Sequence, residues 1–183
     1  MTEWTDETAE WYASKYGEYP TNRLAIAALA LDPEAIIVDI GCGTGAALRQ
    51  AAPQVTQGRL IGIDPIDRMV EIARERCRAH PHGARIEIRQ GPAEALPVED
   101  GVADLVLAFD SYDHWNDTAA GFAEVRRILR PQGRLVVVKD GGIPGDRAGF
   151  IAALAPAGFE IREERQLSED DVSCMMWVCE VAR

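Results

Sequence analysis

Short apolar runs alternate with amphipathic stretches from residue 35 to the C-terminus. Runs rich in β-branched residues lie at 35–40, 59–64, 102–110 and 133–140. Between them, apolar residues recur at helical spacing over 66–77 and 118–130. Such alternation is typical of βαβ units, so the pattern predicts an α/β fold built on a parallel sheet.

Three further runs predict where their strands lie in the sheet. Apolar and charged residues alternate over 84–90 and 159–167, as expected of strands with one face in water. The run 174–179 is apolar throughout, which predicts a strand covered on both faces, with Cys174 and Cys179 on opposite sides. No helix fits in the connection 168–171, so the last two strands should pair antiparallel. We therefore expect seven strands, with the third and sixth at the edges and the seventh inside the sheet.

Composition excludes several classes of protein. The chain has 183 residues, 47% of them hydrophobic and 27% charged, which suits one globular domain. The net charge of −11 disfavours nucleic acid as a partner, because that binding depends on Lys and Arg neutralising phosphates. No apolar run has the length of a membrane span, and the acidic start is unlike a signal peptide. The four cysteines show neither a CxxC pair nor zinc spacing, so we expect a cytoplasmic protein with reduced thiols and no metal.

A glycine-rich turn follows the first predicted strand. Gly41, Gly43 and Gly45 open a helix, where bare backbone and free N–H groups favour close approach by a ligand. With Asp64 about twenty residues on, the spacing also fits the dinucleotide fingerprint. The tighter GxGxG spacing, Asp39 two residues before it and the lack of room for a separate substrate domain favour another cofactor.

Five segments together resemble the class I S-adenosylmethionine-dependent methyltransferases: VDIGCGTG (38–45), IGIDPIDRMVEIAR (61–74), GPAEALP (91–97), ADLVLAFD (103–110) and RILRPQGRLVVV (127–138). The similarity is greatest to the small methyltransferases of ubiquinone and menaquinone biosynthesis, and it covers residues 33 to 140 well. The resemblance implies a doubly wound, Rossmann-like sheet of order 3-2-1-4-5-7-6 with strand 7 antiparallel. It also implies S-adenosylmethionine as cofactor and a small molecule as methyl acceptor.

The same resemblance implies a set of cofactor-binding residues: Asp39, Gly41, Cys42, Gly43, Gly45, Asp64, Pro65, Ile66, Met69, Ala93, Glu94 and Phe109. The methionine part of the cofactor would lie on the glycine loop, with Asp39 orienting that loop or contacting the amino group. Asp64 would accept hydrogen bonds from the ribose, and Ile66 and Met69 would flank adenine. Ala93 would offer adenine a backbone N–H. Pro92 stands where the family often has Asp, so the adenine amino group needs another acceptor, either Glu94 or a backbone carbonyl.

Candidate catalytic residues lie in the loop 110–117, which follows the fourth strand, where open α/β sheets bind ligands. His114 and Asp110 are candidate catalytic residues, with His114 as the general base, which is needed only if the acceptor must lose a proton. Tyr112 and Trp115 are candidate substrate contacts. The competing interpretation is that His114 is a surface or packing residue. Asp117 is expected to be a helix N-cap.

The segment 1–32 precedes the sheet and is expected to be a helical lid or cap of the single domain 1–183. Its aromatic residues Tyr12, Tyr16 and Tyr19 recur, with Trp4, at intervals close to a helical repeat. One interpretation is that this face packs on the sheet as core. In the other, the resemblance implies a lid in which the three tyrosines and Arg23 contact the substrate, with Arg23 meeting an anionic acceptor or the cofactor's carboxylate.

Two alternative functions remain open from the sequence. One is a nicotinamide-dependent oxidoreductase with similar loop geometry. The other is a non-catalytic module that senses S-adenosylmethionine or its product.

Overall fold

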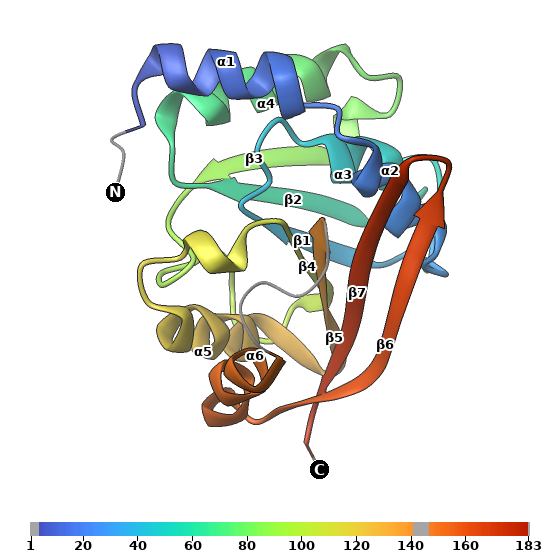
Figure 1. The fold of residues 1–183 in the computed structure, drawn as a ribbon. Helices are drawn as coiled ribbons and strands as arrows, with labels where there is room; N and C mark the ends of the chain where they lie inside the picture. The colour runs from blue at the N-terminus through green and yellow to red at the C-terminus, as the bar shows by residue number, and fades with distance from the viewer. Residues whose placement is uncertain (1–3, 141–146, 183) are drawn as a thin grey trace.

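The protein is built around one sheet (Figure 1). The computed structural model describes residues 4–140 and 147–182. Within this part of the chain the sheet has seven strands in the order β3-β2-β1-β4-β5-β7-β6. The strands are β1 (Ile36–Ile40), β2 (Arg59–Asp64), β3 (Ile86–Gln90), β4 (Ala103–Phe109), β5 (Leu129–Asp140), β6 (Phe159–Glu169) and β7 (Val172–Val181). All neighbours are parallel except β7, which runs antiparallel to both β5 and β6. The predicted order and the reversed seventh strand are confirmed.

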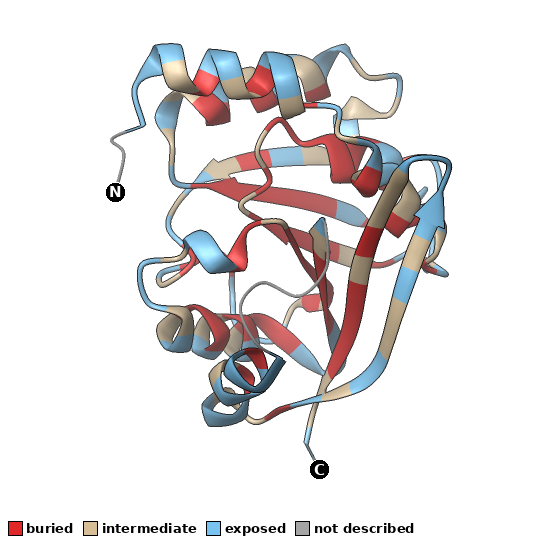
Figure 2. Ribbon diagram, in the orientation of Figure 1, coloured by how far each residue is buried: buried red, intermediate tan, exposed pale blue. Residues whose placement is uncertain are grey.

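The burial of each strand explains its place. Inner strands are largely buried on both faces, whereas β3 and β6 are half-buried or exposed apart from Ile88 and Phe159 (Figure 2). In β7, Met176 belongs to the core on one face of the sheet and Trp177 to the core on the other. Cys174 and Cys179 are likewise buried on opposite faces, as predicted. Two separate cores therefore hold a single sheet.

Helices cover both faces. The helices are α1 (Asp6–Tyr16), α2 (Pro20–Ala27), α3 (Ala46–Ala51), α4 (Asp67–Ala79), α5 (Thr118–Ile128) and α6 (Arg147–Leu154), with 3₁₀ turns η1 (Gly83–Arg85), η2 (Tyr112–His114) and η3 (Ala155–Ala157). Helices α2, α3 and α4 contribute to one core, and α5 and α6 to the other. Asp117 caps α5 by accepting a hydrogen bond from the Ala120 N–H, as predicted. None of the helices among the described residues is long and apolar enough to cross a membrane.

The boundaries of the last strands differ in two places from those expected from the sequence. Strand β5 begins at Leu129 instead of residue 133, because Leu129 pairs with Ala103 before an irregular stretch shifts the register. Strands β6 and β7 extend into the connection 168–171, with Glu169 paired to Val172, so the turn itself is shorter than expected. Asp170 adopts a φ of +51°, a left-handed conformation that Asp tolerates better than most residues.

The N-terminal segment is two helices and not one. Helix α1 ends at Tyr16, and Tyr19 is the N-cap of α2, whose Pro20 suits the first helical position. The regular spacing of the aromatic residues therefore continues across a helix break. The rings still form a row, since the Tyr12–Tyr16 and Tyr16–Tyr19 ring centroids are 5.2 and 5.9 Å apart.

Replacement of Trp177 by Ala should test the insertion of β7. The side chain is 1% exposed, so truncation leaves a cavity and should lower the free energy of unfolding by about 3–5 kcal/mol. Trp11→Ala is the matched control, because Trp11 is 54% exposed and its loss should cost under about 1 kcal/mol. Urea denaturation measures both. Similar losses for the two variants would contradict the placement of β7 between two cores.

Candidate active site

The glycine loop connects β1 to α3 in a left-handed backbone conformation. Gly41, Gly43 and Gly45 have φ values of +71°, +52° and +76°, which glycine adopts without strain. The Gly41 and Cys42 N–H groups both donate to the carbonyl oxygen of Ile63, at 2.8 and 3.0 Å. These bonds join the loop to the end of the neighbouring strand β2.

The three glycines are needed for different reasons. A Cβ at Gly41 would lie 2.5 Å from the Cβ of Ser111, and one at Gly45 would lie 2.7 Å from the Sγ of Cys77. At Gly43 a Cβ would meet nothing within 4 Å. Packing therefore explains Gly41 and Gly45, whereas Gly43 leaves open space of the kind that a ligand approaching the backbone needs.

Asp64 ends β2 and holds the loop in place. Its Oδ2 accepts the Gly43 N–H and its Oδ1 accepts the Ile66 N–H, each at 3.0 Å. Burial raises the pKa of Asp64 to about 6, although the two backbone bonds act in the opposite direction. Each carboxylate oxygen keeps a further lone pair that can accept a hydroxyl.

Asp39, in β1, is a buried carboxylate without a donor. It is 2% exposed, and no hydrogen bond to its oxygens is found within residues 4–140 and 147–182. Burial, and then the nearby charge of Asp64, raise the pKa of Asp39 to about 7. A buried acceptor with no partner is costly, so this position favours a ligand that brings a cation or hydrogen-bond donor.

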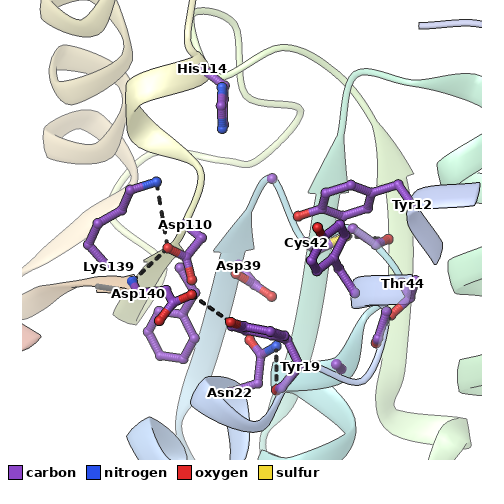
Figure 3. A pocket seen from close by; sticks show the side chains of 16 residues that line it. Tyr12, Tyr19, Asn22, Asp39, Cys42, Thr44, Asp110, His114, Lys139 and Asp140 are labelled. Atoms are coloured by element: carbon purple, nitrogen blue, oxygen red, sulfur yellow. Dashed lines mark hydrogen bonds and ion pairs between the residues drawn. The ribbon is translucent and has the colours of Figure 1, made fainter. Parts of the chain in front are cut away.

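A cavity of about 300 Å³ lies over the carboxyl ends of the central strands (Figure 3). It is lined by Tyr12, Tyr16, Gly17, Tyr19, Asn22, Asp39, Gly41, Cys42, Gly43, Thr44, Ala46, Phe109, Asp110, His114, Lys139 and Asp140. Figure 3 shows Asp39 between Lys139 and Asp140 on one side and Tyr12 on the other, with His114 pointing in from the loop after β4. Ligands bind at this edge in open α/β sheets.

Polar contacts join the ends of β4 and β5. The Oδ1 of Asp110 accepts the Asp140 N–H at 2.8 Å and lies 3.6 Å from the Nζ of Lys139. Lys139 also pairs with Asp113 at 2.9 Å. Burial raises the pKa of Asp110, while the backbone bond and Lys139 lower it. Asp110 has a φ of +50°, which turns the chain into η2 and brings His114 to the cavity.

The turn between α1 and α2 is anchored over the glycine loop. The Thr44 hydroxyl donates to the Gly17 carbonyl oxygen at 2.5 Å, and the Tyr19 hydroxyl donates to Asp140 at 2.6 Å. The Glu18 carboxylate accepts hydrogen bonds from both Arg49 and Arg76. The cavity is thus bounded by the N-terminal segment as well as by the sheet.

The structure brings together part of the set expected from the sequence. The expected residues that line the cavity are Asp39, Gly41, Cys42, Gly43, Phe109, Asp110, His114, Tyr12, Tyr16 and Tyr19. Those outside its lining are Gly45, Asp64, Pro65, Ile66, Met69, Ala93, Glu94, Arg23, Tyr112 and Trp115. Asp64 lies behind the loop, and Met69 is buried beneath Ala9 and Ala13 of α1. Glu94 accepts the Asp117 N–H at 2.9 Å.

Three expected substrate contacts point elsewhere. Arg23 pairs with Glu169 at the end of β6. Tyr112 is buried, with its ring 5.1 Å from that of Phe150. Trp115 packs on α5, where a Cβ on Gly121 would meet its ring at 2.3 Å. Tyr112 is thus buried in the core and Trp115 is half-buried against it, while His114 lines the cavity.

Several lining residues were missed from the sequence. Lys139 and Asp140 end β5, so their position at a carboxyl end of the sheet could have indicated them. Thr44 lies inside the glycine motif, and it matters here because it bonds Gly17. Asn22 and Gly17 have no sequence signal, since only the packing of the N-terminal segment brings them to the cavity.

The sequence profile of the methyltransferase domain matches residues 38–137. The chain belongs to this methyltransferase family. It is 36% identical to a ubiquinone/menaquinone biosynthesis C-methyltransferase of Geotalea uraniireducens, over 56% of this chain and 44% of that protein. It is 32% identical to a demethylmenaquinone methyltransferase of Deinococcus radiodurans, over 71% and 52%. The chain thus spans about half the length of these curated relatives.

The fold is shared with solved methyltransferase structures. An S-adenosylmethionine-dependent methyltransferase from Aquifex aeolicus superposes with a TM-score of 0.79 at 15% identity, covering 97% of this chain and 98% of the other. The family makes S-adenosylmethionine the cofactor of this methyltransferase domain. The open space at Gly43 and the unpaired carboxylate of Asp39 fit the backbone and ammonium of its methionine part.

Gly43→Ala should weaken cofactor binding far more than it weakens the fold. Gly101→Ala is the matched control, since Gly101 also has a positive φ and also has nothing within 4 Å of a built Cβ. Both substitutions should cost about 1 kcal/mol or slightly more in backbone strain. Only Gly43→Ala should lower affinity for S-adenosylhomocysteine in calorimetry, by at least about tenfold. Equal affinities in the two variants would place the cofactor elsewhere.

Asp39→Asn should stabilise the free protein and weaken cofactor binding. The folded pKa of about 7 lies above the ordinary value of 3.8, so the contribution of Asp39 to stability is present below pH 4 and is lost as the pH rises through 7. Removal of the charge should raise the free energy of unfolding at pH 8 by about 1–3 kcal/mol. Affinity for S-adenosylmethionine should fall by about ten- to a hundredfold, because a charge-assisted bond is lost.

Asp67→Asn, at the start of α4 and outside the cavity lining, serves as the control for Asp39→Asn. Denaturation and calorimetry between pH 5 and 8 measure both quantities. Wild-type affinity should also rise with pH across this range, since the cofactor's ammonium requires the charged carboxylate. An Asp39→Asn variant that binds as tightly as wild type at pH 8 would exclude this contact.

Proposed function

We propose that this protein transfers a methyl group from S-adenosylmethionine to a small-molecule acceptor. The observation that carries the proposal is that Gly43, with open space above it, and Asp39, buried without a donor, face one cavity. The lining of the same cavity also includes His114 and three tyrosines, which are side chains suited to a polar acceptor. The nicotinamide alternative finds no support in the family of the chain.

The cofactor's methionine part is held by the glycine loop, with its ammonium at Asp39 and its ribose hydroxyls at the free lone pairs of Asp64. Adenine is assigned to the region of Ile66, Met69 and Ala93. When bound, the sulfonium supplies a methyl group that is already activated for transfer. The protein's task is therefore alignment, which can contribute roughly 7–11 kcal/mol to lowering a barrier.

Within the segment 1–32 we assign the role of a lid to α1 and the turn that follows it, because Ala25 and Ile26 of α2 are buried in the core. Helix α1 packs on α4 through Ala9 and Ala13, and the following turn carries Tyr19 to Asp140 across the cavity. A segment bonded to both the glycine loop and the end of β5 excludes water from the space between them. Its opening would admit ligands.

His114 is assigned as the proton acceptor for an acceptor that has a proton to lose. It lines the cavity from η2 (Figure 3). Asp110 is assigned a positioning role, because its carboxylate is engaged by the Asp140 N–H and lies near Lys139.

Calorimetric titration with S-adenosylmethionine and with NAD, followed by a labelled-methyl transfer screen, tests the function. S-adenosylmethionine should bind and NAD should not. His114→Ala should reduce turnover by at least about tenfold while changing cofactor affinity less than about twofold. His82→Ala, at the start of η1, is the control. Cofactor binding without transfer to any compound would leave a non-catalytic sensing module.

A further inference from the structure

We infer that the methyl acceptor is a cationic small amine. The inference rests on the proposed function and adds the chemical class of the acceptor. Three carboxylates line the cavity, from Asp39, Asp110 and Asp140. Three tyrosine rings line it as well, from Tyr12, Tyr16 and Tyr19. Carboxylates beside aromatic faces are the surroundings that proteins use to hold ammonium groups.

The charges of the cavity disfavour an anionic acceptor. Lys139 is the one lysine or arginine among the described residues that line it. Its ammonium is already paired with Asp113 at 2.9 Å and lies 3.6 Å from Asp110. Arg23, the expected partner of an anion, pairs instead with Glu169. No cation in the described lining is left to meet an anion.

One of the carboxylates has capacity for the acceptor's cation. Asp140 accepts one hydrogen bond from a described side chain, that of Tyr19 at 2.6 Å, and the residue is exposed at the end of β5. Asp39 is assigned to the cofactor's ammonium, and Asp110 lies near Lys139, so Asp140 is the carboxylate left for the acceptor. An ammonium group that enters next to Asp140 would therefore find a carboxylate that can accept its hydrogen bonds.

The tyrosines form a neutral wall. The hydrogen bond to Asp140, with burial, raises the pKa of Tyr19 to about 12. Burial, and then the charges of Asp110 and Asp64, raise the pKa of Tyr12. The Tyr12 and Tyr19 rings therefore stay protonated and offer π faces, not negative oxygens. Outside the cavity lining, Lys15 makes a cation–π contact with Tyr16, with its Nζ 5.2 Å from the ring centroid.

The reaction balances without another reagent. The amine is bound as ammonium and gives one proton to His114, which passes it to solvent. The nitrogen lone pair then forms the N–C bond to the methyl carbon as the C–S bond breaks, and the pair of that bond remains on sulfur. Positive charge moves from sulfur to nitrogen, so the product is again an ammonium ion beside Asp140. The same carboxylate thus stabilises the bound acceptor and the product.

Choline and its neutral carbon isostere 3,3-dimethyl-1-butanol are the probes that test the inference. Each is titrated into the full chain saturated with S-adenosylhomocysteine, whose own binding is measured first. Choline should bind at least about tenfold more tightly than the isostere, because the two differ only in charge. Equal affinities, or tighter binding of the isostere, would overturn the inference. Absence of S-adenosylhomocysteine binding would instead refute the proposed function.

Two charge-removing variants test whether choline is attracted by the cavity or by the net negative charge of the protein. Asp140→Asn keeps an acceptor for the Tyr19 hydroxyl but removes the charge, and it should weaken choline binding by at least about tenfold while S-adenosylhomocysteine affinity changes little. Glu99→Gln, an exposed carboxylate before β4, removes the same charge away from the cavity and should leave choline affinity unchanged. Equal effects of the two variants would show that only overall charge attracts choline. In a transfer screen, aliphatic amines should be methylated and phenols should not.

Discussion

The hydrogen bond from the Gly43 N–H to the Asp64 carboxylate determines how the rest of the site is arranged. It fastens the loop after β1 to the end of β2, and so fixes which backbone surface faces the cavity. The same carboxylate holds the first residue before α4 through the Ile66 N–H. One oxygen of Asp64 thus serves the glycine loop and the other serves the start of α4. Asp39 lies nearby without a donor, and burial, followed by the charge of Asp64, raises the pKa of Asp39. The bare backbone at Gly43 and the unpaired carboxylate of Asp39 are the two features that fit the cofactor.

The two buried carboxylates, Asp39 and Asp64, lower the stability of the free protein and favour binding of a cationic ligand. Two carboxylates buried near each other raise each other's cost of ionisation, and a ligand cation removes most of that cost. The fold tolerates the site because the apolar residues of β7 and of the helices on either face form two large cores. A site that is destabilising when empty and stabilising when filled binds its ligand tightly and responds to pH.

The sequence predicted the elements whose signals are local. The contrast between continuous apolar runs and alternating ones predicted the two edge strands and the inner place of the seventh strand, while the family resemblance supplied the full strand order. The glycine loop followed from its spacing. The roles of residues that depend on packing between distant segments could not be predicted from the sequence. Tyr112 and Trp115 stand in the same loop as His114, and only the η2 turn decides that two face the core and one the cavity. Arg23 could not be assigned because its partner, Glu169, is 146 positions away in the chain.

The N-terminal segment shows why the two interpretations of its aromatic pattern need not compete. One face of α1 is packed against the domain, with Ala9 and Ala13 in a cluster with Met69. Tyr12 and Tyr16 leave the same helix towards the cavity, and the break at Gly17 adds Tyr19 from the next one. Helix α2 is fixed to the domain by Ala25 and Ile26, which are buried in the core on one face of the sheet. Helix α1 rests on α4 through the cluster around Met69. The lid that we propose is therefore α1 with the connection that follows it, and Tyr19 at the end of that connection bonds Asp140, where the proposed acceptor binds.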